Sequence, residues 1–141
     1  MFTIRIAKKE GISFVYSTWL KSYKHDSPLT KYTKRELFFD AHQRILDHLL
    51  SKSKVIIACK DDDEDLIFGY IVFEPHIMHY VYVKEPFRNY GIGKRLIQEI
   101  EQPFQTSHLT YSLLDLWTHK KIQCDFNPYL LGALLWQKMK Y

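Results

Sequence analysis

Hydrophobic residues recur at helical spacing in two stretches near the start of the chain. Over residues 11–24, apolar and aromatic positions lie three and four residues apart, which predicts an amphipathic helix. Its apolar face should carry Ile12, Val15, Tyr16, Trp19, Leu20 and Tyr23. A second helix is indicated at Thr33 to Glu36, a segment with the form of a capping box. The buried face of that helix should be formed by Leu37, Ala41, Ile45 and Leu49, with a solvated polar face opposite.

Other stretches have the spacing of strands. Residues 1–6 alternate between apolar and polar positions, and residues 55–59 and 66–73 are apolar runs on either side of an acidic segment, residues 61–65. The two runs predict a hairpin of buried strands. The acidic segment lacks the spaced oxygen ligands and the glycine of a calcium loop, so we interpret it as a solvated turn and expect no metal site.

A further strand is predicted over residues 77–83, directly before a glycine-rich segment. Strict alternation would place His79, Val81 and Val83 on one face of this strand. The other face would then carry Met78, Tyr80 and Tyr82.

The remaining elements are shorter. A helix should begin at Ile92 and end at Gln102, because Pro103 disfavours helical geometry in the residue before it. After it we expect a strand over residues 108–112, a helix over residues 113–120, a strand over residues 122–126 and a helical turn after Pro128. This succession of strands and helices indicates a mixed α/β fold in one domain, residues 1–141.

The composition agrees with one intracellular domain. Of the 141 residues, 46% are hydrophobic, which is sufficient for a core without disulfides or metals. The two cysteines, Cys59 and Cys124, fall in predicted buried strands and suit a reducing compartment. No apolar run approaches the roughly 20 residues of a membrane span, and the first residues do not have the form of a secretion signal. We therefore expect a soluble, cytoplasmic protein.

The charge favours a partner that carries negative charge. The formal net charge is +4 at pH 7, which suits nucleic acid, an anionic surface or a cofactor with several phosphates. The Lys and Arg residues are scattered along the sequence, without the dense basic block typical of nucleic-acid binding. The distribution of charge thus argues against nucleic acid as the leading hypothesis.

Gly91 and Gly93 stand where the predicted strand passes into the predicted helix. Without side chains, glycines let backbone N–H groups converge on an anion at the start of a helix, where the helix dipole is favourable. Arg88, Lys94 and Arg95 add positive charge around them. The chain has neither the G-x-x-x-x-G-K-[ST] loop nor the G-x-G-x-x-G fingerprint with an acidic ribose partner. The segment is therefore a candidate pyrophosphate site of another type.

Residues 82–97 read Tyr82-Val83-Lys84-Glu85-Pro86-Phe87-Arg88-Asn89-Tyr90-Gly91-Ile92-Gly93-Lys94-Arg95-Leu96-Ile97. This segment resembles the cofactor motif of the GCN5-related N-acetyltransferase family. In that motif a strand ending in Tyr-Val is followed by proline and by [QR]-x-x-G-x-[GA] at the start of a helix. The order of elements over residues 1–126 is also similar. The resemblance implies a mixed, mostly antiparallel central sheet flanked by helices.

The resemblance also implies acetyl-CoA as co-substrate and assigns its binding residues. The backbone of Val81, Tyr82 and Val83 would pair with the pantetheine arm as an added strand. The pyrophosphate would be held by N–H groups of Arg88, Asn89, Tyr90, Gly91, Ile92, Gly93 and Lys94.

Acetyl transfer to an amine needs a neutral nucleophile, although a lysine-like amine has a pKa of about 10.4. A base, a water relay or desolvation must therefore remove the proton. His79 is the first candidate base, because family members often carry a glutamate or another base at this place. Glu74, at the end of the preceding strand, is the second. The sequence leaves open that His79 is a structural histidine at the edge of the core.

The departing thiolate also benefits from an acid, which the family usually supplies as a tyrosine from the short helix after the fifth strand. Trp117 stands at that position here, and an indole N–H is a poor proton donor. Tyr111 and Tyr129 are the alternatives, although each could equally serve in packing. This difference from the family leaves the acid unassigned.

The leading hypothesis is thus an N-acetyltransferase that transfers the acetyl group directly to an amine of a protein or small molecule. The acceptor pocket is expected between Trp19 and Lys34, where the family varies, and its candidate residues are Trp19, Tyr23, Lys31 and Tyr32. A catalytically weak acyl-CoA-binding module and a basic nucleic-acid-binding domain are the two alternatives. The C-terminal segment, residues 127–141, differs from the paired strands that usually end the family fold, so the fold is expected to be trimmed there. Apolar residues 130–136 leave a homodimer open.

Overall fold

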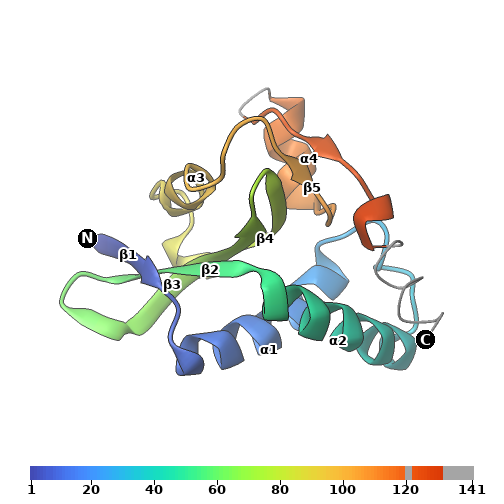
Figure 1. Cartoon of the computed structure of the whole chain (residues 1–141), viewed down its shortest axis with the longest axis horizontal. Coiled ribbons are helices and arrows are strands. Elements are labelled where there is room, and N and C mark those ends of the chain that lie inside the picture. Colours follow the sequence, from blue (N-terminus) through green and yellow to red (C-terminus); the bar gives the residue numbers. More distant parts are fainter. Residues whose placement is uncertain (120–121, 132–141) are drawn as a thin grey trace.

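The computed structural model describes residues 1–119 and 122–131. Within them, a six-stranded sheet runs through the centre in the order β1-β2-β3-β4-β5-β6 (Figure 1). In chain order the elements are β1 (Phe2–Ile6), α1 (Lys9–His25), α2 (Arg35–Lys52), β2 (Lys54–Lys60), β3 (Asp63–Glu74), β4 (Ile77–Val83), the 3-10 turn η1 (Glu85–Phe87), α3 (Ile92–Ile97), β5 (Gln105–Thr106), α4 (Tyr111–Thr118) and β6 (Asp125–Phe126). Strands β1 to β4 are antiparallel neighbours, whereas β5 and β6 join in parallel. The mixed, mostly antiparallel sheet flanked by helices is confirmed.

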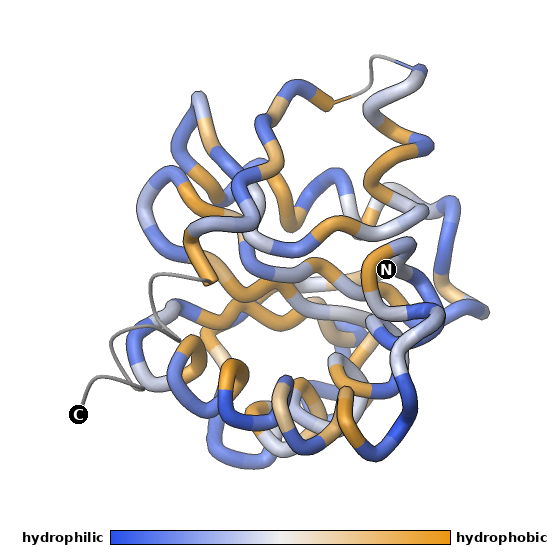
Figure 2. Tube along the Cα trace, turned by 90° about the vertical axis from the view of Figure 1, so that its right-hand side faces the viewer, coloured by the Kyte–Doolittle hydropathy of each residue, from blue (hydrophilic) through white to orange (hydrophobic). Residues whose placement is uncertain are grey.

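Helices cover both faces of the sheet (Figure 1). Helices α1 and α2 pack on one face, where the core includes Trp19, Leu46 and Tyr70. Helix α3 and the start of α4 pack on the other, against a core that includes Ile71 and Leu96. Figure 2 shows the apolar residues concentrated along the strands and on the inward sides of the helices. Every described helix is too short or too polar to cross a lipid bilayer.

Helix α2 buries only part of the predicted face, because Leu49 is buried and Ile45 partly buried as predicted, but Leu37 and Ala41 are exposed. Its buried residues are Phe38, His42, Leu46 and Leu49, whereas Leu37 is 61% exposed. The predicted face was wrong by about one residue because His42 was counted as polar, although it lies one turn after Phe38 on the side that meets the sheet. The capping box is also wrong. The cap residue is Lys34, which makes no side-chain capping bond.

The C-terminal elements begin and end elsewhere than predicted. The predicted strand over residues 108–112 is wrong, because Thr110 caps α4 by accepting a hydrogen bond from the Leu113 N–H at 3.0 Å. The strand before it is β5, and the strand after α4 is only β6, so Cys124 lies outside the sheet and is partly buried. Helix α3 ends before Gln102. A turn does follow Pro128, whose carbonyl accepts from Leu131 N–H at 3.2 Å. Residues 132–141 lie outside the described part.

A β-bulge interrupts the alternation of β4. Val72 pairs with Tyr80 and Phe73 with Met78, so His79 has no partner opposite it on β3. Because the extra residue shifts the alternation, Met78 packs in the core of Val81, away from Tyr80. The prediction that Met78 and Tyr80 share a face is therefore wrong, and so is strict alternation of His79 with Val81.

Candidate active site

The sheet opens between β4 and β5. The two strands pair only at Ile77 with Gln105 and at Met78 with Thr106, and the Ser107 N–H then donates to the Met78 carbonyl at 3.1 Å. Among the described residues, no backbone hydrogen bond continues this pairing along the rest of β4. A cavity of about 1410 Å³ occupies the opening, bounded by β4, the glycine loop, α4 and the end of α1.

Most of the residues that the family resemblance assigns to the cofactor line this cavity. They are Val81, Tyr82, Val83, Arg88, Asn89, Gly91, Ile92, Gly93 and Lys94. Tyr90 does not line it. Its side chain is 60% exposed and borders a separate hollow beside Phe68 and Phe87.

The loop into α3 depends on backbone geometry that few residues adopt. Gly91, the residue before α3, has φ of +82°, and Asn89 has φ of +70°. A Cβ built on Gly91 would meet no atom within 4 Å, so the position requires glycine for its φ and not for space. The Gly91 carbonyl accepts from the Arg95 N–H at 3.0 Å and begins the helix.

Opposite charges lie on different sides of the cavity. Arg88 and Lys94 line it from the glycine loop, and the Arg88 Nε donates to the Val83 carbonyl at 2.9 Å, which holds this side chain beside β4. Asp26 lines it from the end of α1 and accepts a hydrogen bond from Ser112 Oγ at 2.8 Å. The arrangement suits an anion near the loop and a cation near α1.

His79, the candidate base, lines the cavity and is only 2% exposed. Its Nε2 lies 2.6 Å from Glu74 Oε2, and its Nδ1 lies 2.7 Å from Ser107 Oγ. Burial lowers the pKa of His79, although the Glu74 carboxylate opposes this shift. The two candidate bases, His79 and Glu74, therefore lie in contact, and the burial that lowers the pKa of His79 favours its neutral imidazole at pH 7.

Hydrogen bonds continue from His79 into the core. Ser107 Oγ lies 2.9 Å from His108 Nδ1, and His108 Nε2 lies 2.8 Å from His42 Nε2. We call these five residues, Glu74, His79, Ser107, His108 and His42, the histidine network. Burial lowers the pKa of His42 to about 4 and holds the pKa of His108 well below its usual range. In the described ranges, no three His, Cys, Asp or Glu side chains are arranged to hold a metal ion.

The sequence analysis did not identify Ser107, His108 or His42. The available signal was the position of His42, which follows Phe38 by four residues and precedes Leu46 by four, so it belongs to a buried helical stripe. Ser107 and His108 could not be identified in this way, because His108 was assigned to the predicted strand over residues 108–112, which does not exist, and Ser107 was assigned to no element.

The candidate acids lie away from this site. Neither Tyr111, which is 40% exposed, nor Tyr129, which is 80% exposed, lines the cavity, and the same holds for Trp117. Tyr80 does line it, and its hydroxyl lies 2.5 Å from Ser22 Oγ. Burial raises the pKa of Tyr80, so this phenol keeps its proton at neutral pH.

The predicted acceptor residues divide into two groups. Trp19 is fully buried and Tyr23 is 3% exposed, so both belong to the core and their assignment to a substrate pocket is wrong. Tyr32 is 87% exposed and does not line the cavity. Ser22 and His25 line it instead, from the last turns of α1.

Acid should destabilise the protein through the buried His42. The folded-state pKa of His42 is about 4, below its ordinary value of 6.5. The contribution of neutral His42 to the free energy of unfolding is therefore fully present above pH 6.5. Below pH 6.5 the unfolded chain binds a proton that the folded protein does not, and the free energy of unfolding falls until about pH 4. Between pH 7.5 and 5 the loss due to His42 should be about 2 kcal/mol.

Urea unfolding of wild type and His42→Gln at both pH values would measure this loss. Glutamine can still donate a hydrogen bond to His108 but does not titrate, so the variant should lose less stability on acidification. His119→Gln, at a ring on the surface, is the matched control and should behave as wild type. Equal losses in His42→Gln and wild type would contradict a neutral His42 in the folded state.

Comparisons with known proteins agree with this geometry. The model of the acetyltransferase (GNAT) family matches residues 6–123. No curated protein sequence matches the chain.

Solved structures of low sequence identity share the fold. A Pyrococcus furiosus protein described as an acetyl transferase is 16% identical, with a TM-score of 0.56 over 99% of this chain and 91% of that one. A Clostridium difficile 630 protein described as an acetyltransferase is 14% identical, with a TM-score of 0.58 over 90% and 94%. A GCN5-related N-acetyltransferase from Rhodopseudomonas palustris is 16% identical, with a TM-score of 0.50 over 69% of this chain. This chain spans only 61% of the Rhodopseudomonas protein.

The family match covers the first helices, the opened sheet and the glycine loop, which are the parts that form the cavity. The chain therefore belongs to the acetyltransferase (GNAT) family.

Proposed function

We propose that the chain is an acetyl-CoA-dependent N-acyltransferase that moves an acetyl group directly to an amine in a ternary complex. The observation that carries this proposal is the cavity between β4 and β5, where an unpaired strand edge leads to a positively charged glycine loop. Such an edge can accept an extended ligand through backbone hydrogen bonds. The loop can accept phosphate oxygens.

The cofactor residues have separate roles in this proposal. The β4 edge at residues 81–83 binds the pantetheine arm, and the N–H groups of residues 88–94 bind the pyrophosphate. Arg88 and Lys94 add positive charge at that end of the cavity. When bound, acetyl-CoA supplies the thioester that the amine attacks. A binding site that aligns amine and thioester can contribute about 7–11 kcal/mol to the rate through proximity.

His79 is the proposed base, and Glu74 is its partner. The lowered pKa of His79 keeps its imidazole neutral and able to take a proton at pH 7. Asp26 on the other side of the cavity would attract a protonated amine. Both cysteines are free, which supports a reducing, cytoplasmic location. Of residues 130–136, the apolar segment that left a homodimer open, only Leu130 and Leu131 belong to the described part of the chain.

A weak acyl-CoA-binding module is the second candidate function. It is favoured by one observation, the distance of the candidate acids from the cavity, since Trp117, Tyr111 and Tyr129 all lie outside its lining. Such a module would bind acetyl-CoA without releasing CoA in the presence of an amine. Assays of binding and of turnover therefore separate the two functions.

Acetyl-CoA should raise the thermal stability of the protein. A ligand at a hundred times its dissociation constant stabilises a fold by about 2.7 kcal/mol, which differential scanning fluorimetry detects. Gly91→Val should remove this shift, because a β-branched residue is strained at φ of +82° and would displace the loop N–H groups. Tyr90→Ala alters a side chain outside the cavity and should keep the shift. No shift of wild type at millimolar acetyl-CoA would contradict both candidate functions.

A further inference from the structure

Both ring nitrogens of His79 already have hydrogen-bond partners. Nε2 faces the Glu74 carboxylate at 2.6 Å, and Nδ1 faces the Ser107 hydroxyl at 2.7 Å. An amine in the cavity therefore finds no vacant nitrogen on the candidate base. If His79 removes a proton from the acceptor, the proton must pass through one of these partners.

The chemistry of Glu74 fixes the direction of every bond in the histidine network. An ionised carboxylate only accepts hydrogen bonds, so a neutral His79 carries its proton on Nε2 and accepts at Nδ1. Ser107 must then donate its hydroxyl proton to His79. His108 in turn donates from Nδ1 to Ser107, and its Nε2 accepts from Nε2 of His42. One arrangement of tautomers thus satisfies all four contacts.

Ser107 occupies the point where the strands separate. Ser107 directly follows β5, and its N–H donates to the Met78 carbonyl. After this hydrogen bond the described chain turns away from β4. The two residues that the Ser107 hydroxyl contacts, His79 and His108, both line the cavity. A hydroxyl has one proton and two lone pairs, and here one lone pair receives the His108 bond. Ser107 is 1% exposed and does not itself line the cavity, so its second lone pair can receive the proton of an acceptor amine only through a water molecule between His79 and His108.

We propose that Ser107 is the entry point for the acceptor's proton, which is relayed through His79 to Glu74, with His108 and His42 as positioning residues. This inference rests on the proposed acyltransfer. In the relay, an N–H bond of the ammonium breaks as a bridging water takes its proton, and this water gives up one of its own protons to form a new O–H bond on Ser107. The former Ser107 proton moves to Nδ1 of His79, and the Nε2 proton of His79 moves to Glu74. Each group between the amine and Glu74 regains a proton, and no redox change occurs.

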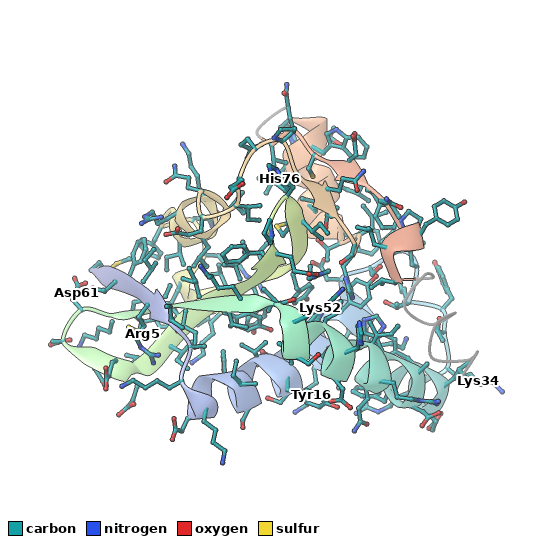
Figure 3. All side chains as sticks on the ribbon, viewed as in Figure 1. Arg5, Tyr16, Lys34, Lys52, Asp61 and His76 are labelled. Atoms are coloured by element: carbon teal, nitrogen blue, oxygen red, sulfur yellow. The ribbon has the colours of Figure 1, made fainter. Side chains whose placement is uncertain are left out.

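The exit of the relay is the least buried member of the network. The Glu74 side chain is 19% exposed, whereas Ser107 and His79 are 1% and 2% exposed. Lys52 Nζ lies 3.6 Å from Glu74 Oε2, at the place where α2 passes into β2 (Figure 3). The relay therefore connects the cavity to a carboxylate that can exchange its proton with solvent. Concerted transfer also avoids a charged imidazole at a position where burial disfavours it.

Ser107→Ala tests the entry point by removing the only hydroxyl in the network. With acetyl-CoA and spermidine as a cationic amine probe, kcat for CoA release should fall at least about 10-fold. The acetyl-CoA thermal shift and the KM for spermidine should stay unchanged. Ser107→Thr, which restores a hydroxyl, should recover most of the rate. Ser53→Ala removes a buried hydroxyl without a partner and is the matched control. Wild-type turnover in Ser107→Ala would overturn the relay and leave the acyltransferase proposal intact.

The tautomers provide a test that needs neither substrate nor turnover. Long-range ¹H–¹⁵N NMR spectra of the unliganded protein at pH 7.5 should show the proton on Nε2 of His79, Nδ1 of His108 and Nε2 of His42. Assignment would use His42→Gln and His79→Gln, each of which removes one set of signals. A proton on Nδ1 of His79, or rapid exchange between its tautomers, would overturn the relay. Failure of acetyl-CoA to bind would instead overturn the proposed function, whatever the tautomers are.

Discussion

His79→Gln is expected to lower kcat by about 10²–10⁴-fold, the usual contribution of a general base. The glutamine side chain offers a donor for Glu74 and an acceptor for Ser107, so the hydrogen bonds of the site can persist without a group that takes up a proton. Because His79 lies at the bulge of β4, outside residues 81–83 and the glycine loop, the thermal shift with acetyl-CoA should be unchanged. Turnover is measured as release of the CoA thiol with an amine that the wild type acetylates.

A second pair of variants separates the base from its partner. Glu74→Gln leaves His79 in place but removes the carboxylate that accepts the relayed proton, so its kcat should also fall while acetyl-CoA still binds. His76→Gln alters a neighbouring histidine on the exposed turn between β3 and β4, where Figure 3 shows it, and should turn over as wild type. Normal turnover in His79→Gln would show that His79 is a structural histidine.

The geometry of the glycine loop, to which we assign the cofactor, could be predicted from the sequence because its determinants are local. The φ of Gly91, the positive charge of Arg88 and Lys94, and the start of α3 all depend on residues close together in the chain. A short stretch of sequence is therefore enough to predict a strand that passes into a glycine loop and a helix. The family motif also covers this segment, so the argument from glycines and charge and the family resemblance indicate the same residues.

His79 and Glu74 were named as candidate bases, but their arrangement with Ser107 could not be predicted, because it depends on register. Nothing in residues 77–83 indicates that His79 is the extra residue of a bulge, since the bulge results from the pairing of Val72 with Tyr80 and Phe73 with Met78. A one-residue change of register moves a side chain to the other face of a sheet. The position of His79 next to Ser107 therefore follows from tertiary structure alone.

The predicted positions of the last strands and helix were wrong for a related reason. Strands β5 and β6 have only two residues each, too few for a period of two to be recognised. Thr110 was assigned to the predicted strand over residues 108–112, although threonine is a good helix cap. Short elements at the edge of a sheet are held by neighbours distant in the sequence, so their own residues specify them weakly.

Trp19→Ala should destabilise the protein by about 3–5 kcal/mol, the range observed when a large aromatic residue is removed from a core. Trp19 is fully buried and stacks on Tyr80, with ring centroids 5.1 Å apart and planes 5° from parallel. Its ring also meets His108 edge-on at 5.1 Å. The cavity left by alanine would therefore open beside both the strand that borders the cofactor cavity and the histidine network.

Two further variants distinguish packing from any effect of the indole N–H. The Trp19 Nε1 is buried without a hydrogen-bond partner, so Trp19→Phe removes an unsatisfied donor while keeping most of the ring and should cost much less than alanine. Trp117→Ala, at a side chain 46% exposed, should change stability by at most about 0.5 kcal/mol. Urea unfolding measures all three. If Trp19→Ala were no less stable than Trp117→Ala, the stack on Tyr80 could not be what holds α1 against β4, and the acceptor side of the cavity would need another support.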